Sequence, residues 1–145
     1  MKSYKDLTEI EQTPLNGYTA IGLFVGAGGS CMGVRAAGVK IVSVNEFIPS
    51  AKECYEKNHK GVPVLLDDIR NITGQDLLRL GGVDKVDIVY GSPPCSGFSA
   101  NGLKENGWGI EKKYSDTVQR VDDLFFEFIR IVNDIRPKVV IAENV

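Results

Sequence analysis

Cys95, which follows two prolines, is the residue best placed in this sequence to act as a nucleophile. It lies in the segment Gly91–Ser99 (GSPPCSGFS), directly after the short run Val86–Tyr90. That run is typical of an interior strand of a parallel sheet, and the prolines end it and fix the backbone. Open α/β sheets bind ligands at the carboxyl ends of their strands, so the turn puts the thiol where a substrate would lie. A lone cysteine is otherwise often a small buried residue, so other residues must support the interpretation.

A glycine-rich turn follows the first expected strand. Thr19–Val25 is apolar and leads into Gly26-Ala27-Gly28-Gly29, after which a helix is predicted over about 30–37. Such a turn lets the backbone approach a nucleotide-like ligand, and the helix N-terminus offers unpaired amides. Cys31 stands where the dinucleotide fingerprint requires a third glycine or alanine. The pattern therefore favours a cofactor without a pyrophosphate over NAD.

Acidic residues follow the second and third expected strands. Glu46 ends the strand Val39–Asn45, where a carboxylate can accept from two ribose hydroxyls, and Phe47 can stack on a purine. After the next strand, Asp68 can accept from an adenine amino group and Ile69 can pack on the ring. The alternatives are a solvated loop carboxylate, a core phenylalanine and an aspartate that caps a turn.

Strands and helices alternate along the chain. This alternation predicts an α/β fold with a doubly wound, mostly parallel sheet and right-handed crossovers. Residues 1–18 are polar and predict a flexible N-terminal lead-in, whereas 19–145 form the expected domain. Further helices are expected over about 49–58 and 73–80, and the clearest amphipathic helix spans 118–135.

The segment between the cysteine and this last helix is long and polar. Residues 96–119 lack periodicity and contain four glycines, so we expect a mobile loop over the site. The last strand, expected over 138–142, leads into Glu143. We place it beside the strand that ends before Cys95, so that the two side chains face one pocket.

Composition excludes several classes of protein. The net charge of −2 gives no field that attracts nucleic acid, and an apolar fraction of 43% is enough for a core. No run is long enough to span a bilayer and the N-terminus lacks a signal-peptide core, so a cytoplasmic protein is expected. Three scattered cysteines and one histidine provide no structural zinc set. We interpret Cys31 and Cys54 as packing residues and His59 as solvated.

The chain resembles the first part of an S-adenosylmethionine-dependent cytosine-C5 DNA methyltransferase. The matching stretches, in the family's order, are Leu23–Gly29, Asn45-Glu46-Phe47, Asp68-Ile69, Gly91–Cys95 and Glu143-Asn144-Val145. The resemblance implies a Rossmann-like class I methyltransferase fold, truncated after the fifth strand. Ser96 stands where many members have glutamine. The family's later arginine-bearing motif, target-recognition region and closing helix have no counterpart here.

The resemblance also implies roles for individual residues. Cys95 would be the nucleophile that adds to C6 of a cytosine, and Glu143 would hold the N3 and amino edge of that base. S-adenosyl-L-methionine is the implied cofactor, held by Phe24, Gly26, Gly28, Gly29, Glu46, Phe47, Asp68, Ile69, Ser92, Pro93 and Leu124. The implied partners are DNA, with the cytosine flipped out, and a complementing C-terminal polypeptide; no membrane and no metal is expected.

Three alternatives remain open. An exocyclic amino methyltransferase shares Ser92-Pro93-Pro94 but has an aromatic residue where Cys95 stands. A tRNA cytosine-C5 methyltransferase shares the same Ser-Pro-Pro-Cys sequence. Finally, the chain is expected to be inactive alone if it is a fragment or one subunit of a split methyltransferase.

Overall fold

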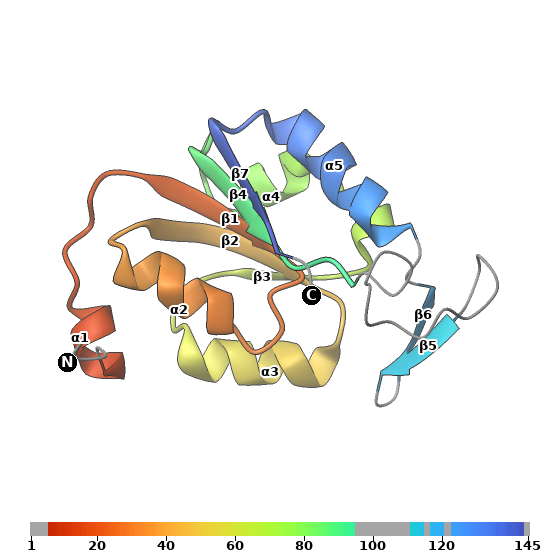
Figure 1. The fold of residues 1–145 in the computed structure, drawn as a ribbon, viewed down its shortest axis with the longest axis horizontal. Coiled ribbons are helices and arrows are strands. Elements are labelled where there is room, and N and C mark those ends of the chain that lie inside the picture. Colours follow the sequence, from red (N-terminus) through yellow and green to blue (C-terminus); the bar gives the residue numbers. More distant parts are fainter. Residues whose placement is uncertain (1–5, 95–110, 115–116, 121–122, 144–145) are drawn as a thin grey trace.

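A five-stranded parallel sheet forms the centre of the molecule. The computed structural model describes residues 6–94, 111–114, 117–120 and 123–143 (Figure 1). The strand order is β3-β2-β1-β4-β7 and every neighbouring pair is parallel. The strands are β1 Thr19–Leu23, β2 Lys40–Glu46, β3 Val64–Leu66, β4 Ile88–Gly91 and β7 Val139–Ala142. The α/β fold predicted from the sequence, a doubly wound parallel sheet, is confirmed.

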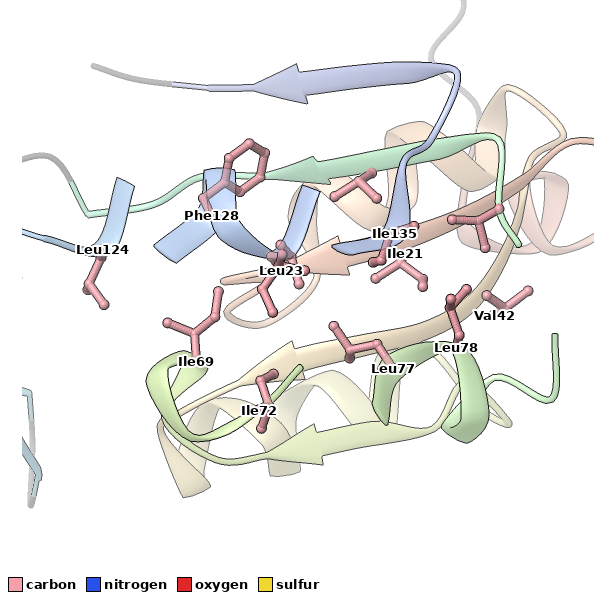
Figure 2. Packing of buried hydrophobic residues seen from close by; sticks show 13 residues of the cluster. Ile21, Leu23, Val42, Ile69, Ile72, Leu77, Leu78, Leu124, Phe128 and Ile135 are labelled. Carbon is pink, nitrogen blue, oxygen red and sulfur yellow. The ribbon is translucent and has the colours of Figure 1, made fainter. Parts of the chain in front are cut away.

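Helices cover both faces of this sheet, as Figure 1 shows. They are α1 Leu7–Glu11, α2 Gly29–Ala36, α3 Pro49–Asn58, α4 Gly74–Leu80 and α5 Leu124–Ile135, with a 3₁₀ turn at Ile69–Asn71. Ile21 and Leu23 of β1 point into the core cluster that contains Leu77 and Phe128 (Figure 2). The preceding residue, Ala20, belongs to a second cluster with residues of α2 and α3. This alternation along β1 shows that both faces of the sheet are buried.

Local sequence signals explain where two of the helices begin. Pro49 occupies the first turn of α3, where its missing N–H costs nothing. Thr73 and Asp76 form a capping box at the start of α4, each side chain accepting from the backbone N–H of the other. The helices predicted over 49–58 and 73–80 are therefore present close to their predicted bounds.

The N-terminal segment, predicted as a flexible lead-in, contains a short helix. Residues 7–11 form α1, which Asp6 and Glu9 close with a second capping box. Arg35 of α2 donates two hydrogen bonds, of 2.7 and 2.8 Å, to backbone carbonyls of residues 13 and 11. The helix is five residues long, too short to show a period in the sequence, and the flexibility of residues 1–18 stays a prediction.

The start of the amphipathic helix, predicted at residue 118, was wrong. Val118 lies in β6 (Thr117–Arg120), which pairs antiparallel with β5 (Glu111–Tyr114), and α5 begins only at Leu124. Thr117 and Val118 are β-branched, which favours a strand. The loop expected over 96–119 therefore contains part of a hairpin, and its segment 96–110, like Cys95, lies outside the described residues.

Two of the three cysteines can be compared with their predicted role. Cys31 is fully buried, as predicted, whereas Cys54 is exposed. The neighbouring Tyr55 takes the buried side of α3, so Cys54 points to solvent and the prediction that it packs was wrong.

No helix within the described ranges is long and apolar enough to cross a membrane. The same ranges contain no group of three or more metal-binding side chains.

Candidate functional site

The strand order reverses direction between β1 and β4. Chain connections run outward to β2 and β3 on one side and to β7 on the other, so a crevice is expected at the carboxyl ends of β1 and β4. A hollow of about 360 Å³ lies there. Its lining residues are Phe24, Val25, Gly26, Ser30, Tyr90, Gly91, Ser92, Ile141 and Glu143. The topology thus places the ends of β1, β4 and β7 around one space.

Four residues predicted for the site line this hollow. They are Phe24, Gly26, Ser92 and Glu143. The Ser92 hydroxyl donates a hydrogen bond to the Glu143 carboxylate, and the Glu143 backbone N–H donates to the carbonyl of Gly91 at 3.0 Å. The predicted adjacency of the last strand and the strand before Cys95 is confirmed, because β4 pairs with β7.

Only one member of the predicted catalytic pair is described. Pro93, two residues after the end of β4, is buried, and the chain then enters residues 95–110. Cys95 therefore lies outside the described residues, and its position relative to Glu143 stays a prediction.

The turn after β1 has an unusual backbone. Phe24 adopts a φ of +54°, Gly26 of +56° and Gly28 of +93°. A positive φ at a bulky residue such as Phe24 is strained and occurs mainly where function or tight geometry requires it. A Cβ atom added at Gly26 or Gly29 would meet no atom within 4 Å. The backbone of this turn is therefore open to a ligand at two of its predicted glycines.

Glu46 is a buried carboxylate held by backbone N–H groups. The residue is only 6% exposed. Gly26 donates to Oε2 at 2.7 Å, and Phe47 and Ile48 each donate to Oε1 at 2.9 Å. A carboxylate offers about four lone-pair positions, so these three bonds leave about one for a ligand. Glu46 is therefore not the solvated loop carboxylate of the alternative interpretation. Its hydrogen bond to a ribose hydroxyl stays a prediction.

The remaining predicted cofactor residues lie along the same edge of the sheet or in the core. Phe47 follows β2 and is half-buried. Asp68 caps the 3₁₀ turn by accepting from the Arg70 N–H at 3.0 Å, and it also forms an ion pair with that side chain at 2.9 Å. Ile69 is 1% exposed and Leu124 is 0% exposed, both within the main core. Core packing encloses these last two side chains in this structure, and their contact with a cofactor stays a prediction.

Asn45, next to Glu46 at the end of β2, is a buried polar residue for which the sequence predicted no role. It is 2% exposed, and its Nδ2 donates to the carbonyls of Leu65 and Asp67 at 3.1 and 2.9 Å. These bonds hold the segment before Asp68 against the end of β2. The available signal was an amide side chain in an otherwise apolar strand, because a buried polar group requires partners.

His59 is buried, not solvated as predicted. The residue is 8% exposed and its Nε2 lies 2.9 Å from the carbonyl oxygen of Gly28. The preceding Asn58 donates from Nδ2 to the carbonyl of Ala27 at 3.2 Å. Both partners belong to the glycine turn, and no local sequence signal indicates contacts across 31 residues.

Tyr90 connects the hollow to the second core cluster. Its hydroxyl donates to Sγ of Cys31 at 2.8 Å. Burial raises the pKa of the Cys31 thiol, so this cysteine stays protonated and unreactive near neutral pH. Cys31 is thus a packing cysteine, as predicted.

A second hollow, of about 450 Å³, lies between α1, α2 and the end of α3. None of the residues predicted for catalysis or cofactor binding lines it.

Comparison with known proteins agrees with this topology. Residues 18–145 match the family of C-5 cytosine-specific DNA methylases. The chain belongs to this family. Methyltransferases of this family generally use S-adenosylmethionine, and the family resemblance inferred from the sequence motifs is confirmed.

Individual relatives give the extent of the similarity. The type II methyltransferase M.FnuDI of Fusobacterium nucleatum is 38% identical over 125 residues, covering 86% of this chain and 31% of that protein. M1.HphI of Haemophilus parahaemolyticus, also a type II methyltransferase, is 36% identical over 127 residues, which are 88% of this chain and 32% of that one. The chain therefore spans about a third of the length of these curated relatives.

A solved structure shows the same fold. A candidate DNA modification methyltransferase encoded within a prophage of E. coli superposes with a TM-score of 0.68 at 25% identity. The superposition covers 89% of this chain and 32% of that one.

Proposed function

We propose that the chain carries the cofactor-binding and nucleophilic part of an enzyme that methylates C5 of cytosine in DNA. The observation that supports this most is the hollow at the ends of β1, β4 and β7. It joins the glycine turn to Glu143, and the segment carrying Cys95 starts at its rim. A methyl donor on the turn and a base at Glu143 would therefore meet in one space.

The residues of the hollow and of the neighbouring strand ends fit S-adenosylmethionine as cofactor. The backbone at Gly26 and Gly29 is open, and Glu46 keeps about one lone-pair position for a ribose hydroxyl. Phe47 and Asp68 follow the next strands along the same edge, where the adenine would lie. The proposed set is completed by Phe24, Gly28, Ile69, Ser92, Pro93 and Leu124. When bound, the cofactor supplies an electrophilic methyl group.

The protein's own residues would activate the cytosine. Cys95 loses its proton, and the thiolate forms a bond to C6 while the electron pair of the C5–C6 double bond moves to C5. Glu143 holds N3 and the amino group and stabilises the charge that develops as C6 is attacked. After C5 has accepted the methyl group, water takes the C5 proton, the electron pair of that C–H bond re-forms the C5–C6 double bond, and the C6–S bond breaks, which restores the thiolate. The base must be out of the duplex for this reaction.

A further polypeptide is proposed to cover β7. Val139, Val140 and Ile141 are 48%, 45% and 50% exposed, although successive side chains of a strand point to opposite faces. Both faces of the sheet are therefore uncovered at this strand, an association liability for a sheet edge. The occupant would be a polypeptide equivalent to the part of the relatives that this chain does not match, present as a continuation or as a separate subunit. Without it, we expect no sequence-specific methylation.

Covalent trapping on DNA tests the proposed chemistry. The chain is co-expressed with the part of the Fusobacterium nucleatum relative that follows its match, and is then mixed with S-adenosylmethionine and a duplex containing 5-fluorocytosine. Fluorine at C5 cannot leave as a proton does, so the protein should remain attached to the DNA. Cys95→Ser should abolish this complex, whereas Cys54→Ser, which alters an exposed thiol, should preserve it.

Nucleoside analysis of ordinary duplex DNA and of tRNA after the reaction distinguishes the alternatives. The proposal predicts 5-methylcytosine in DNA. Methylation at an unchanged rate by Cys95→Ser, or a methyl group on N4, would favour the exocyclic amino methyltransferase, and methylation of tRNA alone would favour the RNA enzyme.

A further inference from the structure

The end of α3 lies against the outer side of the glycine turn. Two consecutive residues, Asn58 and His59, reach two consecutive carbonyls of that turn. The distances are 3.2 Å from Asn58 Nδ2 to the Ala27 oxygen and 2.9 Å between His59 Nε2 and the Gly28 oxygen. Because a carbonyl only accepts, His59 Nε2 must carry the hydrogen in this contact.

His59 is fixed in this position by packing. Its ring stacks on Tyr55, with centroids 4.5 Å apart and an interplanar angle of 26°. Tyr55 is fully buried and His59 is 8% exposed. Burial lowers the pKa of His59, so the ring is neutral near pH 7 and donates through Nε2 in one tautomer.

The turn itself is shaped to receive this ring. A Cβ atom at Gly28 would lie 2.2 Å from His59 Nε2, so only glycine leaves room for the imidazole. Gly28 also has a φ of +93° and is the N-cap residue of α2. In a planar trans peptide the N–H points opposite to the C=O, so holding the Gly28 carbonyl toward α3 turns the Gly29 N–H away from α3.

We propose that Asn58 and His59 are positioning residues of the S-adenosylmethionine site: they fix the carbonyls of Ala27 and Gly28 and thereby set the shape of the turn that receives the cofactor. Neither residue lines the hollow at the ends of β1, β4 and β7. They act through the turn, and this role depends on the proposed function, in which the turn binds the cofactor.

The test compares dissociation constants of S-adenosylmethionine for the 145-residue chain and its variants, measured by calorimetry. His59→Ala should weaken binding on the order of tenfold, the factor for one lost hydrogen bond. His59→Gln, whose amide can donate to the same carbonyl, should recover most of the affinity. Asn58→Ala removes an exposed side chain, so it should fold normally and still weaken binding several-fold. Lys57→Ala, in the last turn of α3, is the control and should bind like the wild type.

Circular dichroism confirms that each variant is folded at the temperature of the measurement. Folded His59→Ala and Asn58→Ala chains that bind as tightly as the wild type would overturn the positioning role. Equal loss in His59→Ala and His59→Gln would also overturn it, since the donated bond would then not matter. A wild-type chain that binds no cofactor would instead refute the proposed function, and the positioning role with it.

Discussion

At the scale of single residues, close packing around Tyr90 beside the hollow leaves no space for a side chain at Gly22. Gly22 lies in β1 beneath Tyr90, and a Cβ atom there would be 2.7 Å from the Tyr90 hydroxyl and 2.8 Å from Val25 Cγ1. Tyr90 lines the hollow and donates to Cys31, so its position affects both the site and the core.

Gly22→Ala should therefore destabilise the fold by about 1–3 kcal/mol, the usual cost of overpacking a core. Urea denaturation followed by circular dichroism measures this change. Gly33→Ala in α2 is the matched control, because a Cβ atom there meets nothing within 4 Å. It should be neutral or stabilising by up to about 1 kcal/mol, from helix propensity. Equal stability of the two variants would mean that Tyr90 moves aside without cost.

At the scale of elements, Asp87 holds together the amino ends of three strands. It accepts from the Thr19 backbone N–H at 2.9 Å at the start of β1, and from Lys138 Nζ at 2.7 Å just before β7. Its own residue directly precedes β4. The hydrogen bonds from Lys138 and Thr19 lower the pKa of Asp87 to about 2.

Asp87→Asn should consequently change how stability depends on pH. The folded pKa of about 2 lies below the unfolded value of about 3.9, so the wild type has this stabilisation above pH ~4 and loses it toward pH 2. The variant should melt at a lower temperature at pH 7 and lose less stability between pH ~4 and ~2.

Thermal melts over this pH range measure the difference. Asp84→Asn is the control, since the Asp84 side chain is exposed and forms no ion pair in the part of the chain that the structure describes. A variant curve at Asp87 parallel to that of the wild type would contradict the assigned role.

Some helices and strands could be predicted from local features of the sequence, and others could not. The alternation of strands and helices predicted the parallel sheet and the pairing of its last two strands, β4 and β7. Local signals at Pro49 and Thr73 predicted where α3 and α4 begin. The start of α5 could not be predicted in this way, because Val118 fits helical spacing although it belongs to a hairpin whose pairing is non-local. Ile69 was predicted to contact the cofactor from its place after a strand, and Leu124 from family resemblance alone; the sequence did not show that both side chains pack in the core. The burial of His59 and Asn45 depends on hydrogen bonds between segments far apart in the sequence, which periodicity cannot predict.

At the scale of the whole molecule, the uncovered strand β7 determines how the isolated chain should behave. Val139 and Ile141 pair with Ile88 and Tyr90, and Val140 pairs with Val89, so the exposed side chains lie on both faces. We expect the purified chain to associate as its concentration rises. The double variant Val139→Lys with Ile141→Lys should remain monomeric and keep its fold, because both side chains are about half exposed.

Light scattering and sedimentation across a concentration series measure this behaviour. Leu7→Lys is the control, since it changes an exposed apolar residue far from β7. A wild-type chain that stays monomeric at high concentration, or methylates DNA site-specifically by itself, would show that β7 needs no covering polypeptide.

Binding of S-adenosylmethionine to the folded chain, measured by calorimetry, tests most directly whether the crevice beside Glu46 is the cofactor site. One molecule should bind per chain. Glu46→Gln should weaken binding by about 10- to 100-fold, the range for hydrogen bonds to a charged group, whereas Glu56→Gln, on the exposed side of α3, should not. A folded wild-type chain that binds no cofactor, or a folded Glu46→Gln chain that binds it equally well, would contradict this assignment.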